Sequence, residues 1–196
     1  MIPSRVVLAT ANPGKVAELG PLVAGWGVVD VISLEAFPGV ELPEEGDESY
    51  AANAVAKART IATATALPAL GDDSGLEVDA LGGAPGVRSA RWAPTDGERV
   101  AKLLDALRDA VGAARGARFR CVAALVWPDG RTITAEGECA GRIAGTPRGT
   151  GGFGYDPVFV PDGLETTFAA AAPELKQRLS HRARAIVALG RVLARA

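Results

Sequence analysis

The most constraining feature of the sequence is a pair of long strands in the middle of the chain. Residues 117–143, ARFRCVAALVWPDGRTITAEGECAGRI, form two runs joined by a Pro-Asp-Gly segment, which predicts a β-hairpin. Strand and helix patterns alternate on both sides of this hairpin. The arrangement predicts an α/β fold with a mixed, twisted sheet flanked by helices. An inserted β-rich lobe would leave a cleft between two halves, and such clefts commonly bind ligands.

The remaining elements follow from apolar periodicity and turn residues. The amphipathic helix expected at 93–111 should bury one face, which contains Val100, Leu103, Leu104 and Leu107. No linker is long enough to separate autonomous domains, so we predict one domain over residues 1–196, with two lobes. The other expected elements are strands at 5–10 and 28–33, a helix at 50–67 capped by Ser49 or Asp47, short strands PALGDD and LEVDAL around an acidic turn, a strand after the glycine-rich segment at 149–157, and one or two helices at 172–196.

Charge and apolar content exclude several classes of partner. The 196 residues carry a formal net charge of −2, which argues against a large basic footprint for nucleic acid. No apolar segment is long enough for a signal peptide or a membrane span, so we expect a cytoplasmic protein with no membrane partner. Cys121 and Cys139 are expected to be buried free thiols.

The first candidate binding motif is TANPGK, residues 10–15, which lies between an expected strand and an expected helix. Such a loop presents backbone N–H groups and a helix N-terminus, which suit an anion. Asn12 and Lys15 add a polar and a cationic side chain. The motif has neither Walker A nor GxGxxG spacing, so a phosphate site and an ordinary polar turn both remain open.

The second motif is the pair of adjacent carboxylates Asp72 and Asp73, which follows an apolar run. If they are buried, two such acids need a cation or a raised pKa. Because neighbouring strand residues face opposite sides, one acid can face a ligand while the other pairs with an arginine. Mg²⁺ binds one or two carboxylates together with substrate phosphates, and the acidic loop could add Glu44 or Glu45. A magnesium site and a solvated turn both remain open on this spacing.

The third motif is the glycine-rich segment GTGGFGYDP, residues 149–157. Its glycines would let the backbone approach a flat ligand, and Phe153 or Tyr155 could stack on a base. Asp156 could accept hydrogen bonds from ring N–H groups. The alternative is a β-bulge with both aromatic rings in the core.

A basic cluster near the C-terminus completes the set. KQRLSHR, residues 176–182, contains the only histidine of the chain, His181, beside Arg182 and at an expected helix junction. A phosphate loop, an acidic segment, a glycine-aromatic loop and a basic cluster are together the parts needed to bind a nucleoside triphosphate with Mg²⁺.

These motifs together resemble a known family. TANPGK, DDSGLEVDALGGAPGVRSAR, GTGGFGYDPVF and the K…SHR cluster occur in the order found in the noncanonical purine nucleoside triphosphate pyrophosphatases, the RdgB-like inosine/xanthosine triphosphate pyrophosphatases. The resemblance spans nearly the whole chain and implies a two-lobed α/β fold around an elongated mixed sheet, in a homodimer. It also implies Mg²⁺-dependent hydrolysis of XTP, ITP and dITP to the nucleoside monophosphate and pyrophosphate.

The resemblance also implies roles for individual residues. Asp73 would be the general base and a metal ligand, with Glu44 or Glu45 as the second carboxylate, and we favour Glu44. The segment SYAANA departs from the family, because Ala52 stands where a glutamate is usual. The alternatives are a nucleotide pyrophosphatase with other preferences, such as modified pyrimidine triphosphates, and a noncatalytic nucleotide-binding protein. The implied substrate contacts are Thr10, Ala11, Asn12, Pro13, Gly14, Lys15, Ser74, Phe153, Gly154, Tyr155, Asp156, Lys176, His181 and Arg182, with His181 or Arg182 expected to read the 6-keto oxygen of the base.

Overall fold

The computed structural model describes residues 2–195, which form two compact units. The first unit contains the chain up to Asp73, Cys121–Gly137 and the segment from His181 onward. The second contains Ser74–Arg120 and Glu138–Ser180. Three strands contribute residues to both units, so the chain passes from one unit to the other along continuous strands.

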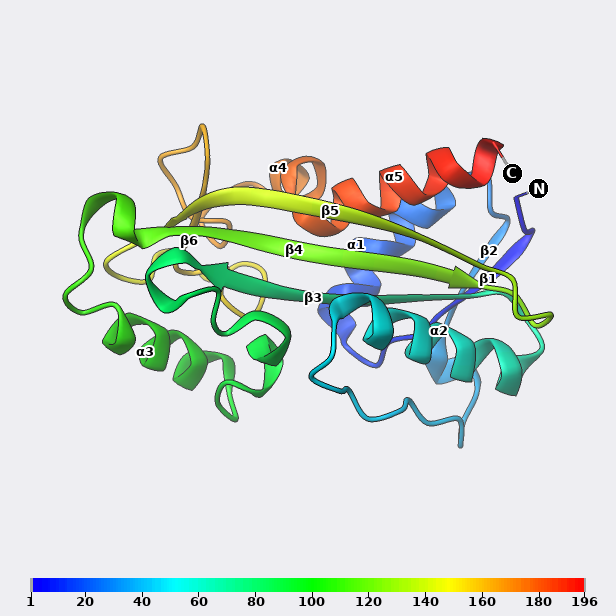
Figure 1. The fold of residues 1–196 in the computed structure, drawn as a ribbon. Helices are drawn as coiled ribbons and strands as arrows, with labels where there is room; N and C mark the ends of the chain where they lie inside the picture. Colours follow the sequence, from blue (N-terminus) through cyan, green and yellow to red (C-terminus); the bar gives the residue numbers. More distant parts are fainter. Residues whose placement is uncertain (1, 196) are drawn as a thin grey trace. The chain divides into compact units, whose positions relative to one another are not determined.

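A mixed sheet carries the fold (Figure 1), which confirms the predicted class. In the described part of the chain its strand order is β2-β1-β3-β4-β5-β6. Strand β1 pairs in parallel with β2 and β3, whereas β5 and β6 are antiparallel. The predicted hairpin is β4 and β5, closed by a turn in which the amide of Trp127 donates to the carbonyl of Arg131 at 2.9 Å. The strands are β1 (Arg5–Leu8), β2 (Asp30–Ser33), β3 (Ala69–Val78), β4 (Gly116–Val126), β5 (Thr132–Ile143) and β6 (Phe159–Pro161).

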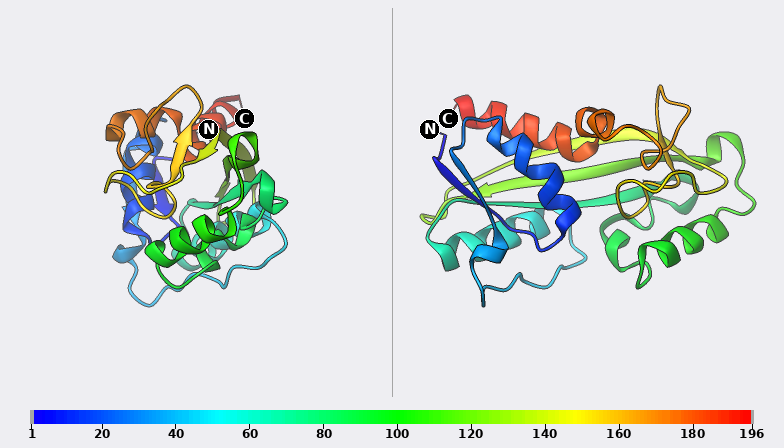
Figure 2. Two further views of the ribbon diagram at one scale, coloured as in Figure 1. Left: turned by 90° about the vertical axis from the view of Figure 1, so that its left-hand side faces the viewer. Right: turned by 180° about the vertical axis from the view of Figure 1, so that it is seen from behind.

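Helices cover both faces of the strands in the first unit. Helices α1 (Pro13–Ala24) and α5 (His181–Arg195) contact each other, as the rear view in Figure 2 shows, and α2 (Tyr50–Thr65) lies against the opposite face in Figure 1. Ser49 caps α2 by accepting from the amide of Ala52 at 3.1 Å, as predicted. A short 3-10 helix, η1 (Leu34–Ala36), follows β2. The core of this unit is built from apolar residues of β1, β3, β4, α1 and α5.

The second unit has its own apolar core. Helix α3 (Asp96–Ala106) begins with a capping box formed by Thr95 and Glu98. The predicted apolar face is confirmed, because Val100, Leu103 and Leu107 are buried and Leu104 packs beside them. The other helical segments are η2 (Asp79–Leu81), η3 (Gly86–Arg91), η4 (Gly112–Arg115) and α4 (Pro173–Leu179). Within residues 2–195, no helix is long and apolar enough to cross a membrane.

One prediction about the strands is wrong. PALGDD and LEVDAL are not separate strands around a turn, because β3 runs without interruption from Ala69 to Val78. Asp72 and Asp73 therefore lie inside a buried strand, with relative exposures of 1% and 4%. Asp, Ser and Gly favour turns on their own, but tertiary contacts to the two acids override that local preference.

The two cysteines are free and buried, as predicted. Burial raises the pKa of the Cys121 thiol to about 12, and the nearby Asp72 charge acts in the same direction. Because the thiolate is the reactive species, we expect the native protein to react very slowly with Ellman's reagent at pH 8. Both thiols should react within minutes after unfolding in guanidinium chloride. Rapid labelling of the folded protein at either position would contradict this burial.

Candidate functional site

The two adjacent acids of β3 face opposite sides of the strand, as the alternation of side chains requires. Asp73 points toward α2, where it contacts Asn53 and Lys57. Asp72 points toward α1 and α5, where it contacts Lys15 and Arg182. One strand therefore supplies two separate carboxylate clusters from consecutive residues.

The Asp73 cluster is held by two residues of α2. The side-chain amide of Asn53 donates to Asp73 Oδ2 at 2.9 Å, and Lys57 Nζ lies 3.4 Å from Asp73 Oδ1. Asn53 and Lys57 are four residues apart, so they share one face of the helix. Burial raises the pKa of the Asp73 carboxyl, while the Lys57 charge and the Asn53 hydrogen bond oppose that shift. A carboxylate with a raised pKa is a stronger base than an ordinary aspartate.

The acidic loop joins this cluster through Glu45. Lys57 Nζ donates to Glu45 Oε1 at 2.7 Å, so one ammonium group bridges the carboxylates of Glu45 and Asp73. Asn53 also fixes the loop, because its amide donates to the Gly46 carbonyl at 3.0 Å and its oxygen accepts from the Gly46 amide at 2.9 Å. Glu44 is exposed, and it takes part in none of the ion pairs recorded among residues 2–195. Of the two candidates for the second metal carboxylate, Glu45 is therefore the one linked to Asp73 through Lys57, and the preference for Glu44 stays a prediction.

The Asp72 cluster is a chain of alternating charges. Asp72 Oδ2 lies 3.0 Å from Lys15 Nζ and 3.1 Å from Arg182 Nε, and Arg182 also pairs with Glu18. Burial alone would raise the pKa of Asp72, but the Lys15 and Arg182 charges hold it well below its usual range. Arg182 is only 2% exposed, so its guanidinium is committed to these acids in this structure.

The loop at residues 10–15 lies where the sequence predicted, between β1 and α1. Asn12 is the N-cap of α1, and its Oδ1 accepts from the amide of Lys15 at 3.2 Å. The amide of Asn12 donates to Thr10 Oγ1 at 3.1 Å, which fixes the turn before the helix. Ala11 and Pro13 are exposed and Gly14 is partly buried. The loop thus presents the start of a helix and places Lys15 beside Asp72.

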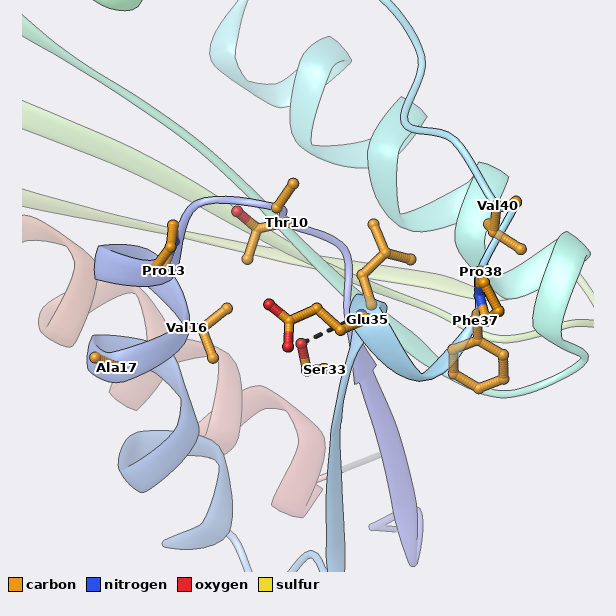
Figure 3. A pocket seen from close by; sticks show the side chains of 12 residues that line it. Thr10, Pro13, Val16, Ala17, Ser33, Glu35, Phe37, Pro38 and Val40 are labelled. Carbon is orange, nitrogen blue, oxygen red and sulfur yellow. Dashed lines mark hydrogen bonds between the residues drawn. The ribbon is translucent and has the colours of Figure 1, made fainter.

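A pocket of about 520 Å³ lies next to this loop in the first unit (Figure 3). Thr10, Pro13 and Val16 form one wall, and Glu35 and Phe37 belong to the other. Glu35 belongs to η1, and its amide donates at 3.3 Å to Oγ of Ser33, the N-cap of that helix. Neither carboxylate of the adjacent pair lines this pocket, so it is distinct from both acid clusters.

In the second unit, the glycine-rich loop contacts Lys176, the lysine of the basic segment 176–182. Asp156 Oδ2 accepts from the amide of Phe153 at 2.8 Å and from Lys176 Nζ at 2.5 Å. Lys176 Nζ also lies 4.6 Å from the centre of the Phe153 ring, which is a cation–π distance. Gly152 has a φ of +71°, and a Cβ there would lie 2.0 Å from Asp156 Oδ2. Only glycine permits this loop, and the loop brings Phe153, Asp156 and Lys176 together.

The remaining predicted contacts have mixed placements. Tyr155 belongs to the core, with 4% exposure and its hydroxyl donating to the Ser89 carbonyl at 3.0 Å, so the alternative of a core aromatic holds for this residue. Gly154 donates its amide to Asp96 Oδ2 at 2.7 Å. Ser74 is half-buried directly after Asp73, and His181 is buried at the first position of α5.

Sequence reasoning missed Asn53, Lys57 and Glu18 as members of these clusters. A signal was present for the first two, because a polar pair four residues apart in an alanine-rich helix marks a face that is not simply apolar. Glu18 offered no such signal, since its partner lies 164 residues further along the chain.

The Asp73 cluster offers carboxylate oxygens to a divalent cation. Among residues 2–195, no three His, Cys, Asp or Glu side chains converge in a way that could hold a metal ion. Two carboxylates do converge, at Asp73 and Glu45, and both already contact a cationic group. Mg²⁺ typically takes one or two carboxylates and completes its shell with water and substrate phosphates. The donor set fits that mode of binding.

Comparisons with known proteins identify the family of the chain. A protein of Streptomyces avermitilis named dITP/XTP pyrophosphatase is 46% identical over 186 residues, which cover 93% of each chain. A Thermus thermophilus protein of the same name is 48% identical over 189 residues, covering 94% of this chain and 89% of that one. A solved structure of a HAM1 protein from Coxiella burnetii matches with a TM-score of 0.86 at 40% identity, covering 98% of this chain and 99% of that one. The sequence profile of the Ham1 family matches residues 6–192, and the chain therefore belongs to the Ham1 family.

Proposed function

We propose that this chain is a Mg²⁺-dependent nucleoside triphosphate pyrophosphatase. Its substrates are noncanonical purine nucleotides, XTP, ITP and dITP, and its products are the nucleoside monophosphate and pyrophosphate. The observation that carries the proposal is the buried Asp73 carboxylate, held by Asn53 and Lys57 beside Glu45. The names of the relatives from Streptomyces avermitilis and Thermus thermophilus support the substrate class.

Asp73 and Glu45 are the residues that would hold the cation. When bound, Mg²⁺ would neutralise phosphate charge and lower the pKa of a coordinated water. The remaining chemistry belongs to the chain. Asp73 takes the proton of the attacking water, and burial suits it to this task because it raises the pKa of the carboxyl.

The first turn of α1 supplies the anion-binding groups. Lys15 is partly exposed, with 15% of its side chain accessible, and its ammonium can turn from Asp72 to a phosphate oxygen. Asp72 then keeps Arg182 as its counter-charge, so it is not left as an unpaired buried acid. Charge that develops on the leaving pyrophosphate is stabilised by Lys15. In the second unit, Phe153, Asp156 and Lys176 remain predicted nucleotide contacts.

The reaction itself is the first test. With dITP we expect pyrophosphate release that requires Mg²⁺ and stops when the metal is removed by EDTA, then returns when Mg²⁺ is added back. The control substrate is dATP, which lacks the 6-keto group and should be turned over much more slowly, because a site built for hydrogen bonds rejects a mismatched pattern. Faster turnover of modified pyrimidine triphosphates would identify a different pyrophosphatase. Binding of dITP without pyrophosphate release would identify a noncatalytic nucleotide-binding protein.

The role of Glu45 as the second carboxylate for the cation can be tested separately. We expect Glu45→Gln to raise the Mg²⁺ concentration needed for half-maximal activity by about tenfold or more, as loss of a metal ligand or its support does. Glu44→Gln is the matched control, since it makes the same change one residue away at an exposed position. The reverse order of effects would return the role to Glu44.

We also infer a homodimer from the family resemblance. Light scattering should give a mass twice that of the chain, and a monomer mass at working concentrations would contradict it.

A further inference from the structure

The first turn of α5 lies against the backbone of β5 at Gly137. A Cβ built on Gly137 would lie 2.2 Å from the His181 carbonyl oxygen and 2.3 Å from the Ala185 amide nitrogen. Ordinary van der Waals contact begins at 3.4 Å. These partners are backbone atoms of a helix, so they cannot rotate away as the end of a flexible side chain can.

A left-handed backbone conformation is not the reason why residue 137 is a glycine. The φ of Gly137 is not among the positive values found at other glycines of residues 2–195. A glycine inside a strand weakens it, because the residue loses more backbone entropy and offers no side chain for packing. What the glycine provides is space, and that space is taken by backbone atoms of α5, of which the His181 carbonyl oxygen and the Ala185 amide nitrogen lie nearest.

Other contacts also hold the first turn of α5 in place. Ala185 and Ile186 are fully buried in the core of the first unit, and the Arg182 guanidinium is held by Asp72 and Glu18. A methyl group at position 137 therefore has to lift the turn by about 1 Å to reach an ordinary contact distance. Misplacement of about 1 Å can cost on the order of 100-fold in rate.

We propose that Gly137 is a positioning residue, whose missing side chain sets the placement of His181 and Arg182 and through them the selectivity for the 6-keto purine. The inference rests on the proposed function for its kinetic readout, because His181 or Arg182 is the expected reader of the 6-keto oxygen of the base. It does not rest on that function for its structural readout, since His181 is the only histidine of the chain and can be observed directly.

The kinetic test compares Gly137→Ala with the unmodified protein on dITP and dATP. We expect the ratio of the two kcat/KM values to fall by about tenfold or more, with the larger part of the change in the KM for dITP. A ratio does not depend on the fraction of protein that is folded, so a simple loss of stability leaves it unchanged. A ratio within twofold of the unmodified protein would overturn the proposal.

Gly190→Ala is the matched control on the same helix. A Cβ at Gly190 would lie 2.5 Å from Nε1 of Trp26, a side chain in the turn after α1. Gly190 itself is nine residues along α5 from His181. This variant also crowds α5, but we expect its dITP to dATP ratio to stay within twofold of the unmodified value. A fall as large as that of Gly137→Ala would show that any disturbance of α5 changes selectivity, and would overturn the specific role of Gly137.

The structural test uses the imidazole signal of His181 in a ¹³C-histidine-labelled protein. We expect its Cε1–H cross-peak to move in Gly137→Ala and to stay in place in Gly190→Ala. An unmoved peak in Gly137→Ala would overturn the proposal whether or not the protein hydrolyses dITP. Absence of pyrophosphate release from dITP in the unmodified protein would instead refute the proposed function and leave this result standing.

A second variant covers the case in which Gly137→Ala does not fold. Ala185 is fully buried in the same core, and Ala185→Val crowds the first turn of α5 from the helix side. We expect the same movement of the His181 peak and the same direction of change in the selectivity ratio. Unchanged values for both would overturn the proposal.

Discussion

Replacement of Asp73 by asparagine is expected to lower kcat for dITP by about 10²–10⁴-fold, the usual contribution of a general base. Asparagine has nearly the same shape, and its one oxygen can still accept from Asn53, as Asp73 Oδ2 does. Its NH2 group would then replace the oxygen that faces Lys57, whose ammonium keeps Glu45 as a partner, so the fold should be kept. The measurement is steady-state pyrophosphate release at saturating Mg²⁺, together with a thermal unfolding curve for the same preparation.

Asp162→Asn is the matched control, because Asp162 is an exposed aspartate of the second unit with no place in the site. It should keep the activity of the unmodified protein. Near-normal turnover by Asp73→Asn would remove Asp73 from the role of base. A loss of activity together with a loss of the unfolding transition would show instead that Asp73 is needed for folding.

Replacement of Arg182 by leucine should have the largest effect on stability. Its guanidinium is 2% exposed and pairs with Asp72 and Glu18, so the change removes a buried cation from both acids, of which Asp72 keeps Lys15. Removing one partner of a buried ion pair typically costs about 3–5 kcal/mol. For a chain of this length we expect Tm to fall by about 10 °C.

The control for this prediction is an arginine in an exposed ion pair. Arg108 and Asp105 pair on the surface, with 73% and 67% of their side chains accessible, and such pairs contribute about 0–1 kcal/mol. Arg108→Leu should therefore change Tm by no more than a few degrees. Equal effects of the two variants would mean that the buried network does not stabilise the fold. The dITP to dATP ratio of Arg182→Leu is a second readout, and an unchanged ratio would exclude Arg182 as a reader of the base.

Much of the fold follows from local pattern. The hairpin, the amphipathic face of α3, the capped start of α2 and the loop before α1 each depend on residues close together in the sequence, and the structure confirms them. The opposite placement of Asp72 and Asp73 was also predictable, because alternation along a strand is a property of the backbone.

The continuity of β3 could not be predicted from the residues that neighbour Asp72 and Asp73 in the sequence. Asp72 and Asp73 are compatible with a buried strand only because Lys15, Lys57 and Arg182 neutralise them, and these cations come from three different helices. The sequence around the acids contains no sign of those partners, so local propensity favoured a turn. The position of Glu45 near Asp73 depends in the same way on distant residues, since Asn53 binds the neighbouring Gly46 and Lys57 binds Glu45 itself.

The alternation of the two acids along β3 also limits how the sequence of this strand can change during evolution. Side chains repeat with a period of two, so deleting one residue ahead of the acids would turn both carboxylates to the opposite faces of the strand. Asp73 would then take the place of Asp72 beside Arg182, and Ser74 would take the place of Asp73 beside Lys57. Surface loops can change length freely, but in this strand a single-residue deletion would abolish the site without removing either carboxylate.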